Sequence, residues 1–107
     1  MHHVLCAHGR AIEVLRDLGV SNLGAVCNFE YAHPSSDCEE DVQAADLYDG
    51  HYNRFFIEGL FKGAYPDNVM QGLEPHMPKG WQDDFPLIGQ KLDWLGVNYY
   101  TLSLIHI

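Results

Sequence analysis

The stretch that decides the fold is KLDWLGVNYYT, residues 91–101. Its apolar centre is typical of a short strand buried on both faces, as in parallel sheets. The strand ends in three side chains that can hydrogen-bond, Asn98, Tyr99 and Tyr100. In a parallel α/β barrel, polar residues at the carboxyl end of a strand lie where the chemistry takes place. The stretch therefore predicts a parallel strand with site residues at its end, and an ordinary polar turn is the alternative reading.

The first part of the chain predicts a helix followed by a second short strand. Apolar residues recur with helical spacing from Val4 to Leu18, and Gly19 follows where a left-handed C-cap would stand. Residues 23–27 then form a short apolar run that predicts a strand. Residues 32–37 are expected to form a loop.

The rest of the chain, from residue 36 to residue 98, predicts a long helix, a short helix and a second strand. Ser36 and Glu39 have capping-box spacing, which indicates a long helix through residue 61, interrupted at Gly50. Residues 63–66 break the chain, residues 72–81 are expected to be a loop, and residues 84–91 a short helix. The last strand is expected over residues 92–98, with Asp93 capping its entry. The order helix, strand, helix, strand is typical of consecutive βα units.

Several motifs along the chain carry a family resemblance. They are HHVLCAHG at residues 2–9, LGAVCN at residues 23–28, FF at residues 55–56, GAYP at residues 63–66 and GVNYYT at residues 96–101. In this order and at these separations they resemble glycoside hydrolase family 1, the β-glucosidase family. The resemblance covers nearly the whole chain, from His2 to Thr101, and implies an α/β fold that is part of a (β/α)8 TIM barrel.

The resemblance also implies a retaining glycosidase with two catalytic glutamates. The family carries the acid/base in a Thr-x-Asn-Glu-Pro motif ending strand 4 and the nucleophile in a Thr-Glu-Asn-Gly motif ending strand 7. Neither motif occurs in this sequence. A complete barrel needs about 250 residues, and 107 residues hold roughly two of its eight βα units. We therefore expect an internal section, from the helix after strand 4 through strand 6, that hydrolyses nothing by itself.

Three site residues follow from the resemblance. Tyr100 matches the family tyrosine whose hydroxyl hydrogen-bonds the nucleophilic carboxylate, where a phenol donor would stabilise the ionised form. Asn98 matches an asparagine near the sugar-binding subsite. Asn28 matches a polar residue bordering the leaving-group subsite, where an amide can both donate to and accept from sugar hydroxyls. Tyr99 is expected to pack into the barrel wall, because alternate strand residues point to opposite faces.

Other candidate site residues favour structural roles. Glu30, just past the first strand, is expected to be a loop carboxylate. His2, His3 and His8 are expected to pack within an outer helix, because zinc pairs on a helix prefer an i, i+4 spacing and the separation from His3 to His8 is i+5. The sequence thus predicts no metal site and no cofactor. The competing hypothesis is a small non-catalytic sugar-binding or scaffolding module.

Composition excludes several classes of partner. The formal net charge of −9 argues against nucleic acid and against an anionic membrane surface, and no apolar run approaches the about 20 residues of a membrane span. The expected partner is a β-glucoside or oligosaccharide, and the oligomeric state is not encoded in any motif. Three cysteines without a Cys-x-x-Cys pair indicate reduced thiols and a cytoplasmic location.

The last six residues differ from everything before them. Residues 1–101 are assigned to the barrel segment. Residues 102–107 read LSLIHI, an apolar hexapeptide that contains no turn residues and matches no family motif. We expect it to be a non-native tail.

Overall fold

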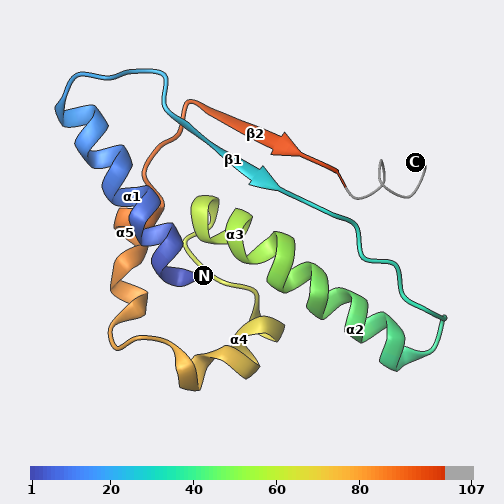
Figure 1. Ribbon diagram of the computed structural model, residues 1–107. Coiled ribbons are helices and arrows are strands. Elements are labelled where there is room, and N and C mark those ends of the chain that lie inside the picture. The colour runs from blue at the N-terminus through green and yellow to red at the C-terminus, as the bar shows by residue number, and fades with distance from the viewer. Residues whose placement is uncertain (101–107) are drawn as a thin grey trace.

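The computed structural model describes residues 1–100, so the expected tail at residues 102–107 lies outside the described part (Figure 1). Within these residues, five α-helices and two strands follow one another along the chain. In chain order they are α1 (His2–Asp17), β1 (Gly24–Asn28), α2 (Glu39–Asp49), α3 (Phe55–Phe61), α4 (Asp67–Leu73), α5 (Phe85–Ile88) and β2 (Trp94–Asn98). A π-helical turn (Gly50–Arg54) joins α2 to α3, and 3₁₀ turns span Glu74–His76 and Trp81–Asp84.

The two strands form a parallel pair, as the sequence predicts. Among residues 1–100 the sheet consists of β1 and β2, with Gly24 opposite Trp94 and Asn28 opposite Asn98. Asp93 joins the two strand starts, because its carboxylate accepts the Leu23 amide at 2.8 Å while its own amide donates to the Leu23 carbonyl at 2.7 Å. The predicted capping role of Asp93 is therefore confirmed, and it also fixes the strand register.

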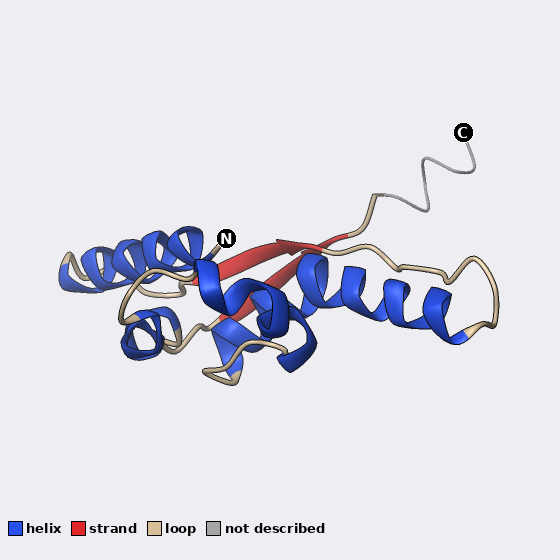
Figure 2. Ribbon diagram, turned by 90° about the horizontal axis from the view of Figure 1, so that it is seen from below, coloured by secondary structure: helices blue, strands red, loops and turns tan. Residues whose placement is uncertain are grey.

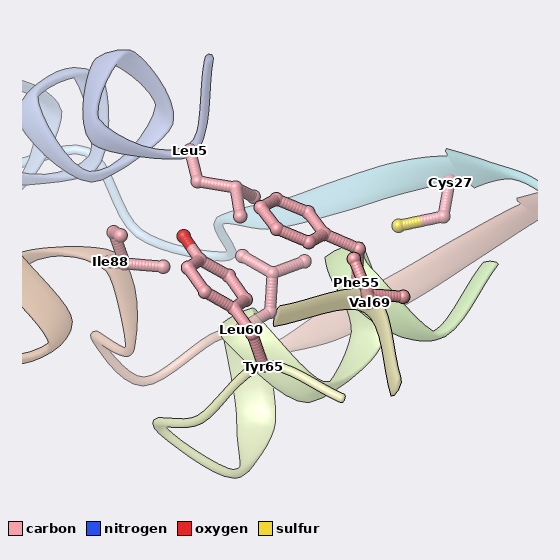
Figure 3. Close-up of a cluster of buried hydrophobic side chains, with 7 residues drawn as sticks. All are labelled: Leu5, Cys27, Phe55, Leu60, Tyr65, Val69 and Ile88. Carbon is pink, nitrogen blue, oxygen red and sulfur yellow. The ribbon is translucent and has the colours of Figure 1, made fainter. Parts of the chain in front are cut away.

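The helices all lie on one side of the sheet. Figure 1 shows the strands along one edge of the molecule with the helices beneath them, and Figure 2 shows the helices in front when seen from below. The core forms where this helical layer meets β1 (Figure 3). It contains the buried side chains of Leu5, Cys27, Phe55, Leu60, Tyr65, Val69 and Ile88.

The first helix forms where the spacing predicts it, but its buried face differs from the apolar pattern. The buried stripe on α1 is formed by His2, Leu5, Gly9 and Ile12, whereas Val4 and Val14 of the apolar pattern are exposed. Beyond the helix, Gly19 adopts φ +82°, the left-handed conformation expected of it. None of the helices in the described part of the chain is long and apolar enough to cross a membrane.

The long second helix differs from its prediction at its start and at Gly50. The capping box is wrong: Cys38 is the N-cap, and the Ser36 hydroxyl accepts the Cys38 amide at 3.2 Å and donates to Asp41 at 2.7 Å. The predicted interruption at Gly50 is a π-helical turn rather than a break. A π turn widens the helix locally and rotates the side chains that follow.

The later elements depart further from the pattern. Helix α4 lies in a region for which no helix is predicted. Its N-cap is Pro66, whose ring fixes the backbone φ angle at the start of the helix. Helix α5 covers only part of residues 84–91 and is preceded by a 3₁₀ turn. Strand β2 begins two residues later than expected, at Trp94, after the Asp93 contact.

Two glycines in helices are expected to respond oppositely to alanine. A Cβ on Gly9 would overlap the backbone oxygen of Leu87, so Gly9→Ala must push α1 away from α5. Overpacking of this kind costs about 1 to 3 kcal/mol. Gly72, in α4, has nothing within 4 Å of its would-be Cβ, so Gly72→Ala should stabilise by about 0.5 to 1 kcal/mol.

Urea unfolding followed by far-ultraviolet circular dichroism measures both effects. The midpoint should fall for Gly9→Ala and rise for Gly72→Ala. Equal shifts in the same direction would contradict the close approach of α1 and α5.

Candidate functional site

Two of the predicted site residues end neighbouring strands. Asn28 is the last residue of β1, Asn98 is the last residue of β2, and the parallel register sets them directly opposite each other. The amide of Phe29 donates to the Asn98 carbonyl at 2.9 Å and continues the pairing past the strand ends. Asn28 is exposed and Asn98 is half-buried. The carboxyl end of the sheet therefore presents two side-by-side amides, each able to donate and accept.

The tyrosines that follow β2 differ in their contacts. Tyr100 is 60% exposed and lies two residues beyond Asn98. The Tyr99 hydroxyl accepts the amide of Tyr31 at 3.2 Å, and Tyr99 is 42% exposed in this section of chain. Tyr99 borders a cavity of about 270 Å³ together with Ile57 of α3. It thus joins the two chain segments that leave the strands.

The loop after β1 is held by side chains that the sequence reading did not single out. Asn53, in the π-helical turn, donates to the Glu30 carbonyl at 2.7 Å and accepts the Glu30 amide at 3.2 Å. The Tyr48 hydroxyl donates to the Glu30 carboxylate, and this bond raises the pKa of Tyr48. Glu30 therefore lies in the loop after β1, as expected, with its carboxylate bonded to Tyr48. An asparagine inside a helix is the one sequence signal that could have pointed to this contact.

A larger cavity lies beside the open edge of β1. It has a volume of about 490 Å³ and is lined mostly by apolar groups of α1, β1 and α3. Asn28 and His8 are among its polar residues. The Nε2 atom of His8 is buried with no hydrogen-bond partner in the described structure, and burial lowers the pKa of His8.

The sheet face opposite the helices is also uncovered within the described residues. Val26 is 58% exposed and Trp94 is 44% exposed, although both belong to strands. The Trp94 ring lies over Gly24, where a Cβ would overlap it. Asn28 and Asn98 continue this same face, because alternate strand residues share one side.

A second cluster of polar side chains, separate from Asn28 and Asn98, lies among the helices. His2 is buried, with its Nε2 atom 2.9 Å from the Asp84 carboxylate and its Nδ1 atom 2.6 Å from the Tyr65 hydroxyl. The hydrogen bond from His2 lowers the pKa of Asp84. Burial, and next the Asp84 charge, raise the pKa of the nearby Cys6 thiol. Burial likewise raises the pKa of Tyr65.

His2, His3 and His8 lie in three different environments. His2 packs inside the helical layer as expected, His3 is exposed, and His8 lines the cavity beside β1. The structure does not bring these three residues to one point. It brings His2 to Cys6 instead, an i, i+4 pair on one helix that was visible in the sequence.

Comparison with known sequences gives one family and many relatives. The family model described as Glycosyl hydrolase family 1 matches residues 1–106. A β-glucosidase of Agrobacterium sp. is 41% identical over 102 residues, which are 94% of this chain and 22% of that protein. A 1,4-β-D-glucan glucohydrolase of Thermotoga neapolitana is 33% identical over 108 residues, which are 98% of this chain and 25% of that protein.

Solved structures agree with the sequence relatives. A β-glucosidase from Thermotoga maritima in complex with glucoimidazole superposes with a TM-score of 0.82 at 32% identity, covering 92% of this chain and 23% of that one. A β-glucosidase from Exiguobacterium marinum gives a TM-score of 0.75 at 29% identity, with 92% and 24% covered. The chain therefore spans about a quarter of the length of the proteins it matches.

Proposed function

Because this chain belongs to glycosyl hydrolase family 1, we propose that it forms one section of a (β/α)8 barrel that hydrolyses β-glucosides. The section would run from the helix after strand 4 through strand 6, so that α1 is that helix and β1 and β2 are strands 5 and 6. The coverage of about a quarter of each relative supports a section of about two of the eight βα units. So does the parallel pairing of β1 and β2, with the connecting helices on one face.

The observation that carries the proposal is the register that sets Asn28 opposite Asn98 at the carboxyl end of the sheet. Active sites of (β/α)8 enzymes are built at this end of the strands. The two amides would hydrogen-bond sugar hydroxyls, Asn98 at the glycone subsite and Asn28 toward the leaving group. They would orient the substrate, since an amide transfers no protons at neutral pH.

The chemistry would come from two carboxylates outside this section. In a retaining glycosidase one carboxylate attacks the anomeric carbon and expels the leaving group, which the other carboxylic acid protonates. Water then hydrolyses the glycosyl ester with the second group acting as base. Tyr100 would act as a positioning residue: its hydroxyl would donate to the nucleophile, hold one carboxylate oxygen and leave the other free to attack.

The uncovered surfaces of the section are what such a barrel would bury. The cavity beside β1 borders the strand edge where strand 4 would pair. The exposed Val26 and Trp94 would face the barrel interior, where layers of strand side chains pack. An isolated parallel pair leaves both of its edges and one face unsatisfied.

A chimaeric enzyme tests the proposal. Residues 2–100 would replace the matching segment of the Agrobacterium β-glucosidase, and hydrolysis of an aryl β-glucoside would be measured. We expect turnover from the chimaera and none from the 107-residue chain by itself, because the two carboxylates come from the host.

The unaltered host enzyme is the positive control. A chimaera that folds with the host's circular dichroism spectrum yet has no activity would contradict the proposal. Turnover by the isolated chain would contradict the placement of both carboxylates outside it. Sugar binding by the isolated chain together with an inactive chimaera would favour a non-catalytic sugar-binding module.

A further inference from the structure

Three side chains with different metal-binding atoms meet where α1 packs against the start of α5. They are His2 and Cys6 on α1 and Asp84 at the end of the 3₁₀ turn before α5. Their nearest ligand atoms all lie within 4.8 Å of one another. We propose that His2, Cys6 and Asp84 form a zinc-binding site that joins these two elements.

The arrangement of the ligand atoms fits one face of a zinc tetrahedron. His2 and Cys6 are four residues apart, so they project from the same side of α1. The His2 Nε2 to Cys6 Sγ distance is 3.5 Å, Cys6 Sγ to Asp84 Oδ2 is 3.7 Å and His2 Nε2 to Asp84 Oδ2 is 2.9 Å. Ordinary zinc bond lengths at tetrahedral angles place such atoms about 3.4 to 3.6 Å apart. Only the His2 to Asp84 pair must widen, by about half an ångström.

Tyr65 supplies the outer contact that a zinc-bound histidine ordinarily has. Its hydroxyl lies 2.6 Å from His2 Nδ1, the ring nitrogen that faces away from Cys6 and Asp84. Figure 3 shows Tyr65 within the core cluster, with its hydroxyl directed toward the helix that carries Leu5. With zinc on Nε2, the proton stays on Nδ1 and donates to Tyr65, which fixes both the tautomer and the ring orientation.

Asp84 occupies a capping position without capping. It is the N-cap residue of α5, a position at which aspartate usually accepts a backbone amide of the first helical turn. Its side chain makes no such bond and instead contacts His2 and Cys6. The carboxylate is thus directed to the cluster rather than to its own helix.

The donor set selects zinc among common divalent ions. One imidazole, one thiol and one carboxylate supply nitrogen, sulfur and oxygen, a combination that zinc accepts in a tetrahedral site. Magnesium and calcium prefer oxygen ligands throughout. The Asp84 side chain is 41% exposed, so solvent can reach the fourth position. A bound ion would cross-link α1 to the chain before α5, segments 78 residues apart along the sequence.

Cobalt substitution of the full 107-residue chain tests the site directly. Co²⁺ coordinated by a thiolate gives a near-ultraviolet sulfur-to-cobalt charge-transfer band, which Zn²⁺ should remove by displacement. We expect the band in the unaltered chain and in Cys38→Ser, the matched control at an exposed cysteine. Cys6→Ser should abolish the band. A band that survives Cys6→Ser would overturn the proposal.

Further variants separate this site from other metal-binding groups. His3→Gln removes any chelate between the chain's amino terminus and the third residue, so the band must persist in that variant. Tyr65→Phe keeps all three ligands and should weaken zinc binding about 10- to 100-fold, measured by competition with a chromophoric chelator. Unchanged affinity in Tyr65→Phe would contradict the role given to its hydroxyl.

Stability provides an independent readout if Cys6→Ser unfolds. Zinc should raise the thermal midpoint of the unaltered chain, because binding to the folded state shifts the unfolding equilibrium. Asp84→Asn changes a partly exposed side chain and should retain its helical circular dichroism while losing most of that shift. No zinc-dependent shift in the unaltered chain, or an equal shift in Asp84→Asn, would overturn the proposal.

Discussion

Tyr100→Phe in the chimaeric enzyme is expected to lower kcat by about 10²- to 10³-fold, the usual cost of removing one donor aimed at a reacting group. KM should change little, because the hydroxyl is proposed to contact the nucleophile rather than the sugar. A donor to an ionised carboxylate lowers the pKa of that carboxylate. Its loss should raise the nucleophile's pKa and move the acid limb of the kcat/KM profile to higher pH.

The adjacent Tyr99→Phe provides the matched control. Tyr99 accepts the Tyr31 amide and borders a cavity that Ile57 also lines, so it belongs to the loop contact rather than to the nucleophile. Steady-state kinetics on an aryl β-glucoside should therefore show the large loss in Tyr100→Phe only. Comparable losses in both variants, or an unshifted acid limb in Tyr100→Phe, would contradict the proposed role.

Phe55→Ala is expected to destabilise the chain by about 3 to 5 kcal/mol, the range for a fully buried phenylalanine. Phe55 is 1% exposed, and its ring stacks on Tyr65 with centroids 3.9 Å apart and an interplanar angle of 9°. Whole domains are stable by only about 5 to 15 kcal/mol. The substitution should therefore remove a large share of the total stability.

Phe61→Ala is the control on the same helix. Phe61 is 54% exposed, and substitutions at exposed positions usually stay within about 0.5 kcal/mol. Urea unfolding followed by circular dichroism should give a large fall in the midpoint for Phe55→Ala and almost none for Phe61→Ala. Similar falls for the two variants would show that the helical layer does not pack around Phe55 as described.

Local patterns account for the elements that the sequence predicts well. Helical spacing of apolar residues predicts α1, and the glycine after it adopts the left-handed conformation that a C-cap requires. The apolar runs at residues 23–27 and 92–98 contain β1 and β2, as expected of short apolar segments between turns. Each of these features depends on neighbouring residues only.

Elements that depend on distant contacts were missed or misjudged. Helix α4 has only seven residues, and its one buried residue, Val69, enters a core assembled from other elements. A helix that short is marginal without tertiary packing. The expected capping box does not form, because the Ser36 hydroxyl donates to Asp41 and Cys38 is the N-cap of α2. The spacing of residues in the sequence does not show which group the Ser36 hydroxyl will bond.

The candidate site divides in the same way. The motif resemblance selected Asn28, Asn98 and Tyr100 from the sequence, and the register then placed the two asparagines side by side. Asn53 was not selected, because its contact with Glu30 spans the loop between β1 and α2 and requires the π-helical turn.

By itself, then, the sequence determined the family and the alternation of helices and strands, because motifs and periodicities are properties of short segments. The tertiary structure alone decided that Asn28 lies opposite Asn98 and that Asp84 meets His2 and Cys6 of α1. Each contact joins segments that lie far apart along the chain, and only the packing of helices on a parallel sheet brings those segments together. Pairings of this kind depend on the assembled core, which no local pattern specifies.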